Sequence, residues 1–120
     1  MSVAHLVDLC RCLGPDPLRF QGPGGNFSAK DGDCLRVKPS GGTLANSAVE
    51  SLVSTSRSAC LAGLPAVRGA VPSAEEESAY VAAVARACLV PGGPRPTMEL
   101  GLHALVPHRY VLHTHSVAGV

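Results

Sequence analysis

The segment GGNFSAKDGDCLRVKPSGG, residues 24–42, contains two short runs of alternating apolar and polar residues around Asp31-Gly32-Asp33. An Asp-Gly pair readily adopts the positive φ values of a tight turn, so the segment predicts a β-hairpin. Glycines lie at both ends of the hairpin, in QGPGGNFS and KPSGG. They let backbone N–H groups approach an anion closely, although ordinary turn formation explains them at least as well.

Helices are predicted on both sides of this hairpin. Apolar residues recur at helical spacing over 3–13, and a Gly-Pro pair ends the pattern. Further along, Ser73 and Glu76 form a capping box for an alanine-rich helix that stops before Pro91. The sequence therefore predicts one amphipathic helix before the hairpin and a longer helix after it.

The other segments complete a pattern of helices and strands. Residues 39–47 are predicted to be a loop, and 48–64 is ambiguous because VESLVSTS fits a strand and RSACLAGL a short helix. Thr97 can cap a helix that runs to about Val106. A β-prone strand over 109–115 follows this helix and carries two histidines. Helices and strands in this order predict an α/β protein.

Composition narrows the classes of function. The 120 residues suffice for one domain, which we expect to span 1–120. Only 3% of the residues are aromatic and none is Trp, so the core must be built from Val, Leu and Ala. A net charge of +1 without a basic block argues against nucleic acid or a membrane as a partner. Small molecules or other protein chains are the expected partners.

The cysteines indicate a reduced, cytoplasmic chain. Five is an odd number, and the cysteines are scattered along a sequence that has no secretory signal and no apolar run of about 20 residues. Cys10 and Cys12 are two apart on a predicted helix and point to different sides of it. We expect them to be small buried residues rather than zinc ligands.

His113 and His115 are two apart in the predicted strand, so both side chains lie on one face, about 6.6 Å apart at ~3.3 Å per residue. Two imidazoles so placed can bind one metal ion. For an isolated HxH, one core histidine and one rim histidine would be the better explanation. The preceding helix favours a metal site, because it can bring Glu99 over the pair. A carboxylate beside a metal is what metal-assisted proton abstraction requires.

Three separated motifs resemble the class II aldolase/adducin family, which includes the zinc-dependent sugar-phosphate aldolases. They are Gly-Asn-x-Ser, Pro-Ser-Gly, and Pro-Thr-x-Glu with His-x-His downstream, and they occur here in the family's order. The resemblance runs from the first helix to the last residue, with a poorly matched middle at about 44–90. It implies a three-layer α/β/α fold around a mainly antiparallel sheet, present here without its C-terminal part.

The resemblance also implies roles for individual residues. His113 and His115 match metal ligands, in the first instance for Zn²⁺, and Glu99 matches the catalytic acid/base. The residues that match the family's substrate-phosphate loops are Gly25, Asn26, Ser40, Gly41 and Thr97. Two features depart from the family. Met98 stands where many family aldolases have a second hydroxyl residue, and the third ligand histidine of the family lies downstream of Val120.

Several other polar residues have ordinary explanations. His103 lies one turn after Glu99 and is either a packed helix histidine or a group that supports the site. His108, next to Arg109, is expected at the surface. Lys30 and Lys38 flank the hairpin and could meet an anion, but solvated lysines at strand ends are the default expectation.

The function implied by the resemblance is that of a metal-dependent carbon-carbon lyase. It would cleave a sugar phosphate or related hydroxyketone through a metal-stabilised enediolate, in a homo-oligomer. Epimerases, dehydratases and decarboxylases share the scaffold and remain alternatives. A non-catalytic adducin-like assembly domain and an inactive fragment are further alternatives. Without the downstream histidine we expect weak metal binding and little activity from the isolated chain.

Overall fold

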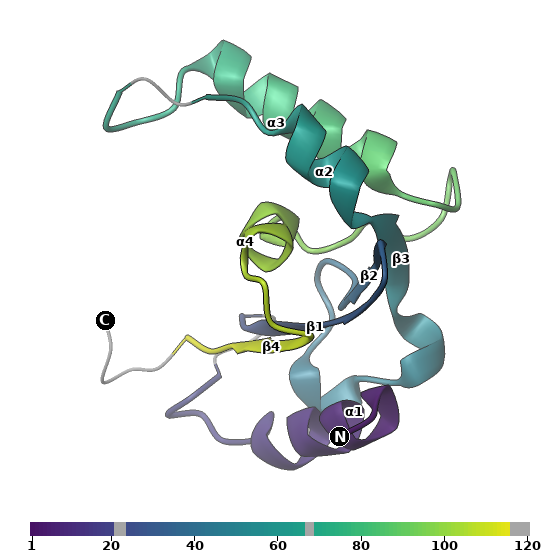
Figure 1. Ribbon diagram of the computed structural model, residues 1–120. Helices are drawn as coiled ribbons and strands as arrows, with labels where there is room; N and C mark the ends of the chain where they lie inside the picture. Colours follow the sequence, from purple (N-terminus) through teal and green to yellow (C-terminus); the bar gives the residue numbers. More distant parts are fainter. Residues whose placement is uncertain (21–23, 67–68, 116–120) are drawn as a thin grey trace.

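The computed structural model describes residues 1–20, 24–66 and 69–115. Four strands form one antiparallel sheet in the order β3-β2-β1-β4 (Figure 1). The strands are β1 (Asn26–Asp31), β2 (Cys34–Val37), β3 (Val53–Ser56) and β4 (Tyr110–His113). The predicted hairpin is confirmed, with Asp31 paired to Cys34 and Gly32 at φ +57° in the turn.

The ambiguous stretch 48–64 contains both elements that its sequence allowed. A short 3₁₀ turn, η2 (Val49–Ser51), precedes β3, so the strand occupies only the second half of VESLVSTS. The helix α2 (Arg57–Gly63) follows β3 directly, and the Ser56 hydroxyl caps it by accepting a hydrogen bond from the Ala59 N–H at 3.1 Å. Residues 39–47 form the predicted loop around a second 3₁₀ turn, η1 (Leu44–Asn46).

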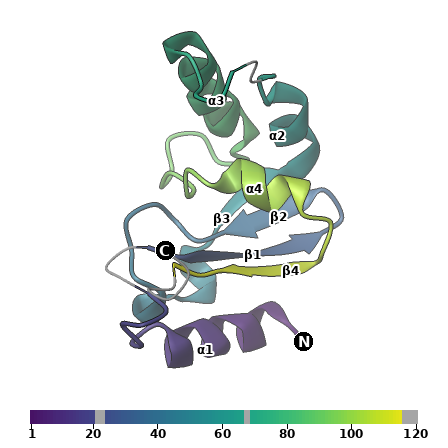
Figure 2. The same cartoon turned by 90° about the vertical axis from the view of Figure 1, so that its left-hand side faces the viewer.

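The helix α1 (Val3–Leu13) covers one face of the sheet, as Figure 2 shows. Its apolar side packs on β1 and on η1 in a core formed by Leu6, Val7, Cys10, Phe20, Phe27, Ala29 and Leu44. At the end of α1, a Cβ on Gly14 would lie 2.5 Å from the backbone nitrogen of Ala45. The close approach between α1 and η1 therefore requires glycine at this position.

The other three helices lie on the opposite side of the sheet (Figure 2). They are α2, α3 (Ala74–Ala87) and α4 (Leu100–Leu105). The core on this side is formed by Leu35, Val37, Cys60, Val84, Ala87, Leu100 and Ala104. Helices on both faces of one antiparallel sheet give the expected α/β/α layers. In α3 the predicted cap is confirmed, because the Ser73 hydroxyl accepts a hydrogen bond from the Glu76 N–H at 3.1 Å.

The strand β1 is buried on both faces. Phe27 and Ala29 belong to the core under α1, whereas the alternate residues Asn26, Ser28 and Lys30 are polar and at most 7% exposed. These polar side chains lie on the side of the sheet covered by α4 and the residues that flank it, with which they form hydrogen bonds. From Asn26 to Lys30 the strand is thus covered on both faces, one of which is polar.

The expectation that Lys30 and Lys38 are solvated is wrong. Lys30 is 7% exposed and Lys38 is 4% exposed. Their ammonium groups reach backbone carbonyls, because Lys30 Nζ donates to the His108 carbonyl at 2.8 Å and Lys38 Nζ donates to the Pro39 carbonyl at 3.2 Å. Long aliphatic stems let both side chains cross buried surface before the charge meets a polar partner.

Two element boundaries also differ from expectation. The N-cap of α4 is Glu99 rather than Thr97, and the helix starts at Leu100. Tyr80 of α3 supplies the missing cap: its hydroxyl accepts from the Gly101 N–H at 3.0 Å and donates to the Met98 carbonyl. The strand β4 ends at His113, so His115 lies beyond it rather than within it.

The five cysteines are all free. Cys10 and Cys60 are buried, as expected for small apolar side chains, but Cys12 is exposed on α1. The two cysteines of the CxC pair therefore point to different sides of the helix, and the prediction that both are buried is wrong. Among the described residues, no helix has the length and apolar character needed to cross a membrane.

Candidate metal centre

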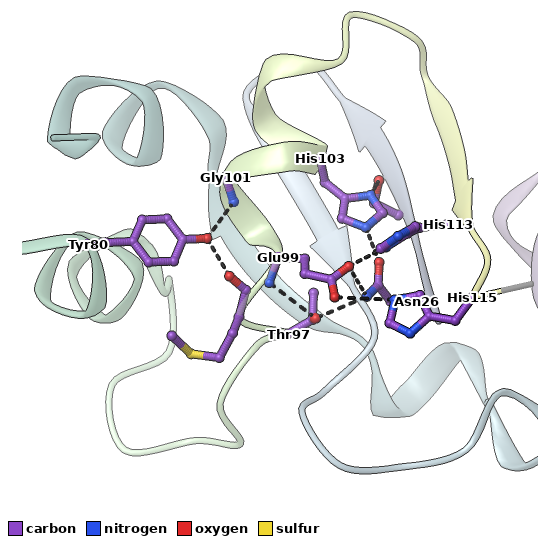
Figure 3. Close-up of polar contacts among 10 residues, drawn as sticks. Asn26, Tyr80, Thr97, Glu99, Gly101, His103, His113 and His115 are labelled. Atoms are coloured by element: carbon purple, nitrogen blue, oxygen red, sulfur yellow. Dashed lines mark hydrogen bonds and ion pairs between the residues drawn. The ribbon is translucent and has the colours of Figure 1, made fainter. Parts of the chain in front are cut away.

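Glu99, His113 and His115 bring one potential ligand atom each to a common point (Figure 3). Glu99 comes from the start of α4, His113 from the end of β4, and His115 from the residues that follow it. The three ligand atoms lie within 4.8 Å of one another. The imidazole rings meet edge to face, with their centroids 4.7 Å apart. The two histidines therefore converge although only one of them belongs to the strand.

The donor set fits a divalent transition metal. His113 Nδ1 contacts Glu99 Oε2, and His115 Nε2 lies 3.6 Å from Glu99 Oε1. His113 Nδ1 is buried, yet within the described part of the chain it has no hydrogen bond of favourable angle. A buried imidazole nitrogen without a hydrogen-bond partner is available as a ligand. Two imidazoles and a carboxylate are also donors that Zn²⁺ accepts in catalytic sites.

Electrostatics keep Glu99 ionised. Burial by itself would raise the pKa of Glu99, but the hydrogen bond from Asn26 and the electrostatic influence of the neighbouring His113 and His115 side chains outweigh this effect. The pKa of Glu99 therefore lies below its ordinary value. At neutral pH the side chain is a carboxylate, able to accept a proton or a metal ion.

Asn26 connects the start of β1 to this carboxylate. Its Nδ2 donates to Glu99 Oε2 at 2.9 Å and to Thr97 Oγ1 at 3.2 Å. The preceding Gly25 has φ +81°, and a Cβ there would lie 2.5 Å from a carbon of the Phe20 ring. Gly25 is thus required both for its backbone conformation and for space. Asn26, the first residue of β1, follows it directly.

The hydroxyl group of Thr97 has a proton that it can donate to a ligand. Its hydroxyl oxygen accepts from Asn26 Nδ2 and, at 3.4 Å, from the Glu99 N–H. A hydroxyl with both lone pairs engaged must point its own proton elsewhere. Within the described residues no acceptor takes that proton, so it is available to a ligand oxygen.

Ser40 and Gly41 lie in an exposed turn. The backbone N–H of Ser40 donates to the Arg95 carbonyl at 2.8 Å, and the N–H of Thr97 donates to the Lys38 carbonyl at 3.1 Å. The Pro-Ser-Gly turn is therefore attached to the segment that precedes α4. In the described ranges, no hydrogen bond or ion pair joins Ser40 or Gly41 to Glu99 or to the two histidines.

Three further residues belong to the environment of Glu99, and sequence analysis undervalued them. Burial lowers the pKa of Lys38, and the negative charge of Glu99 partly offsets that effect, so Lys38 places a buried positive charge near the carboxylate. His103 and Ser28 are fully buried and hydrogen-bonded to each other at 2.7 Å. The one feature of the sequence that indicated this polar environment was the alternation of polar residues at 26, 28 and 30, which marks a polar face of β1.

Comparisons with known proteins were made for the whole chain. A family model described as "Class II Aldolase and Adducin N-terminal domain" matches residues 4–120. One solved structure, described as "Structure of the N-terminal Class II Aldolase domain of a conserved protein from Thermoplasma acidophilum", is similar at a TM-score of 0.79 and 28% identity. The alignment covers 98% of this chain and 56% of that chain, so this chain spans about half of that protein. No curated protein sequence matches.

Proposed function

Because the chain belongs to the class II aldolase/adducin family, we propose that it carries the metal site and the proton-transfer group of a carbon-carbon lyase. The substrate class is a sugar phosphate or a related hydroxyketone. The observation that supports this proposal most strongly is the convergence of Glu99, His113 and His115 from separate elements onto one point. A carboxylate that is ionised and within reach of two imidazoles provides both a base and a metal-binding group.

His113 and His115 would hold the metal ion, in the first instance Zn²⁺, through His113 Nδ1 and His115 Nε2. When bound, such an ion acts as a Lewis acid on an oxygen of the substrate. The arrangement supports this assignment because both nitrogens face Glu99 rather than a donor of hydrogen bonds. The β1–β4 pairing, in which His113 is opposite Asn26, fixes the backbone of one ligand.

Glu99 would transfer the proton. Its carboxylate takes a proton from the carbon next to the substrate carbonyl, and the resulting carboxylic acid returns a proton in the reverse step. A positioned general base of this kind contributes typically about 10²- to 10⁴-fold to a rate. The lowered pKa of Glu99 means that the basic form prevails at neutral pH.

The phosphate of the substrate would be held next to this centre. We assign Thr97 as a donor because its hydroxyl proton has no acceptor among the described residues. The loops that carry Gly25, Asn26, Ser40 and Gly41 complete the proposed phosphate-binding set. Lys38 supplies a buried positive charge near Glu99, which favours an anion.

The wider setting is also proposed rather than observed. We propose that residues 1–120 form one partial class II aldolase-like domain, that the protein is cytoplasmic, and that it works as a homo-oligomer. Epimerase, dehydratase and decarboxylase reactions would use the same proton-transfer group. A non-catalytic assembly role would not require it.

Proton exchange tests the proposal without requiring the natural substrate. The full chain is loaded with Zn²⁺ and incubated in D₂O with dihydroxyacetone phosphate, a simple hydroxyketone phosphate. Transfer of the carbon-bound proton to Glu99, followed by return of a deuteron, removes the corresponding proton signal from the NMR spectrum. We expect exchange above the rate of a protein-free sample, and at least 100-fold slower exchange in Glu99→Gln.

One control variant sharpens this experiment. Glu50→Gln removes an exposed carboxylate from η2 and should leave the exchange rate unchanged. Equal exchange in the wild type and in Glu99→Gln would contradict the role of Glu99. No exchange above the blank in a wild-type chain that calorimetry shows to have bound Zn²⁺ would contradict the enzyme proposal and favour an assembly role.

A further inference from the structure

His103 is a fully buried polar side chain that the proposed chemistry does not use directly. It lies on α4, one turn after Glu99, and both of its ring nitrogens have partners. Its Nδ1 lies 2.7 Å from the Ser28 hydroxyl, and its Nε2 contacts Asn26 Oδ1 (Figure 3). We propose that His103, held by Ser28, is a positioning residue that orients the Asn26 amide toward Glu99. This inference rests on the proposed role of Glu99.

The chemistry of the partners fixes the direction of each hydrogen bond in the network of Glu99, Asn26, His103 and Ser28. The Glu99 carboxylate can only accept, so the Asn26 group that faces it must be Nδ2. Asn26 Oδ1 then faces His103 and can only accept, so His103 Nε2 must carry a proton. The Ser28 hydroxyl donates to the remaining nitrogen, Nδ1. The network thus selects one tautomer of a neutral imidazole.

Burial supports the neutral form. Desolvation, with the nearby charges of Lys30 and His113, lowers the pKa of His103 to about 4, although Glu99 acts in the opposite direction. A doubly protonated ring would also direct a proton at the Ser28 hydroxyl, which would then have to reverse its own bond. The neutral ring with hydrogen on Nε2 is the form that satisfies all three neighbours.

Removal of the His103 N–H would release Asn26. The Asn26 amide could then rotate by half a turn and place its oxygen against the Glu99 carboxylate, where two acceptors repel each other. A hydrogen bond to a charged group contributes roughly 1.5–3 kcal/mol, so its loss corresponds to a change of about 10- to 100-fold in any process that depends on it. The N–H at position 103, rather than the imidazole itself, is what Asn26 requires.

Two substitutions of similar polarity separate the need for an N–H that reaches Asn26 from the need for an imidazole ring. The amide of glutamine in His103→Gln reaches the position of Nε2 and can donate to Asn26. The shorter amide in His103→Asn reaches the position of Nδ1 near Ser28 but not Asn26. Val84→Ala, in the core between α3 and the sheet, is the control for a general loss of stability. Ser28→Ala removes only the donor to Nδ1 and leaves Asn26 to select the tautomer.

NMR of the metal-free full chain tests the network directly, whatever its activity. Long-range proton-nitrogen spectra should show His103 at neutral pH with hydrogen on Nε2 and a bare Nδ1, and should show the same tautomer with a shifted Nδ1 resonance in Ser28→Ala. The two Asn26 side-chain N–H protons should be resolved and slow to exchange in the wild type and in His103→Gln. In His103→Asn they should exchange rapidly.

Proton exchange with dihydroxyacetone phosphate then tests the consequence for Glu99. We expect His103→Asn to slow the maximal rate about 10- to 100-fold, His103→Gln to recover most of it, and Val84→Ala to match the wild type. Equal rates in the Gln and Asn variants would overturn the proposal, as would a charged ring or hydrogen on Nδ1 in the wild type. If the wild type shows no exchange, the proposed function fails, and the Asn26 signals alone decide the inference.

Discussion

A buried neutral histidine makes stability depend on pH. The pKa of His103 falls from 6.5 to about 4 on folding, mainly through desolvation. Between these two values the unfolded chain binds the proton more readily than the folded chain, so stability is lost as pH falls. We expect His103 to account for a loss of about 2 kcal/mol in the free energy of unfolding between pH 7 and pH 5. Urea unfolding at the two pH values measures it.

His103→Gln is the matched control for this pH dependence, because glutamine does not titrate. The difference in unfolding free energy between pH 7 and pH 5 should be smaller in this variant by the same amount. Identical pH dependence in the variant and in the wild type would mean that His103 does not retain its neutral form on folding.

Residue positions were predictable where the order of elements decides them and not where burial decides them. The proximity of Glu99, His113 and His115 could be anticipated, because a short helix followed by a strand can bring the carboxylate over the two imidazoles, whereas their metal-binding role stays a prediction. Lys30 and Lys38 could not be placed correctly. Their charge is visible in the sequence, but their burial depends on the fold. The carbonyl that accepts from Lys30 belongs to the distant His108, whereas Lys38 donates to the adjacent Pro39.

The helix α4 is too short to be stable by itself. It has only six residues, and isolated helices of fewer than about 12 residues are marginal in water. Neighbouring side chains hold both of its ends. The Tyr80 hydroxyl binds the first turn, and Arg57 Nε donates to the Ala104 carbonyl at 2.8 Å near the last turn. These contacts position Glu99, which occupies the N-cap position without capping the helix through its side chain.

Tyr80→Phe should therefore loosen the start of α4. The Gly101 N–H and the Met98 carbonyl would lose their partner while the aromatic ring kept its packing. We expect a loss of roughly 1–2 kcal/mol in the free energy of unfolding and weaker hydrogen-exchange protection at Gly101. Urea unfolding and amide exchange measure the two effects.

Tyr110→Phe provides the control for this substitution. The Tyr110 hydroxyl donates to the Met1 carbonyl at 2.8 Å in an exposed position, where water can replace it. Its removal should change stability by less than about 0.5 kcal/mol. A comparable loss in both variants would show that the Tyr80 hydroxyl has no special part in holding α4.

The difference between the predicted and observed start of α4 has a physical cause. Thr97 is a residue type that commonly caps helices, and the local sequence favoured it. The cap actually comes from a tyrosine on another helix, a partner that short-range patterns do not reveal. The ends of α1 and the start of α3 were predicted correctly because the residues that set them, Ser73 among them, lie within the same few residues as the helix. The helix α3 ends at Ala87, earlier than the stop expected at Pro91.

The sheet as a whole has an exposed edge at β4. Within the described residues β4 pairs only with β1, so one side of its backbone carries unpaired N–H and C=O groups. Its residues are only half-buried, and three of them are Tyr, Val and Leu. An apolar edge strand of this kind tends to pair with another chain.

We therefore expect the chain to self-associate with rising concentration. Light scattering should show an average mass that increases with protein concentration. Val111→Lys places a charge on the edge strand and should reduce the increase, whereas Ser78→Lys adds the same charge to the exposed surface of α3 and should not. A mass that stays monomeric at all concentrations would contradict this expectation.

The layered architecture was predictable only in part from the residues themselves. The helices and the hairpin follow from local patterns, and the family resemblance supplied the three layers. The pairing of β1 with β4 joins residues more than 80 positions apart, and no local pattern specifies it. That pairing brings His113 beside Asn26, so the geometry of the candidate site depends on the least predictable feature of the fold.

The central claim is that His113 and His115 bind a metal ion, and calorimetric titration of the full chain with Zn²⁺ tests it most directly. The wild type should bind one ion per chain, Glu99→Gln should retain measurable binding through the two imidazoles, and the double variant His113→Ala with His115→Ala should lose it. His5→Ala with His108→Ala removes two exposed histidines and is the matched control. Binding that is indistinguishable between the wild type and the His113/His115 double variant would contradict the account.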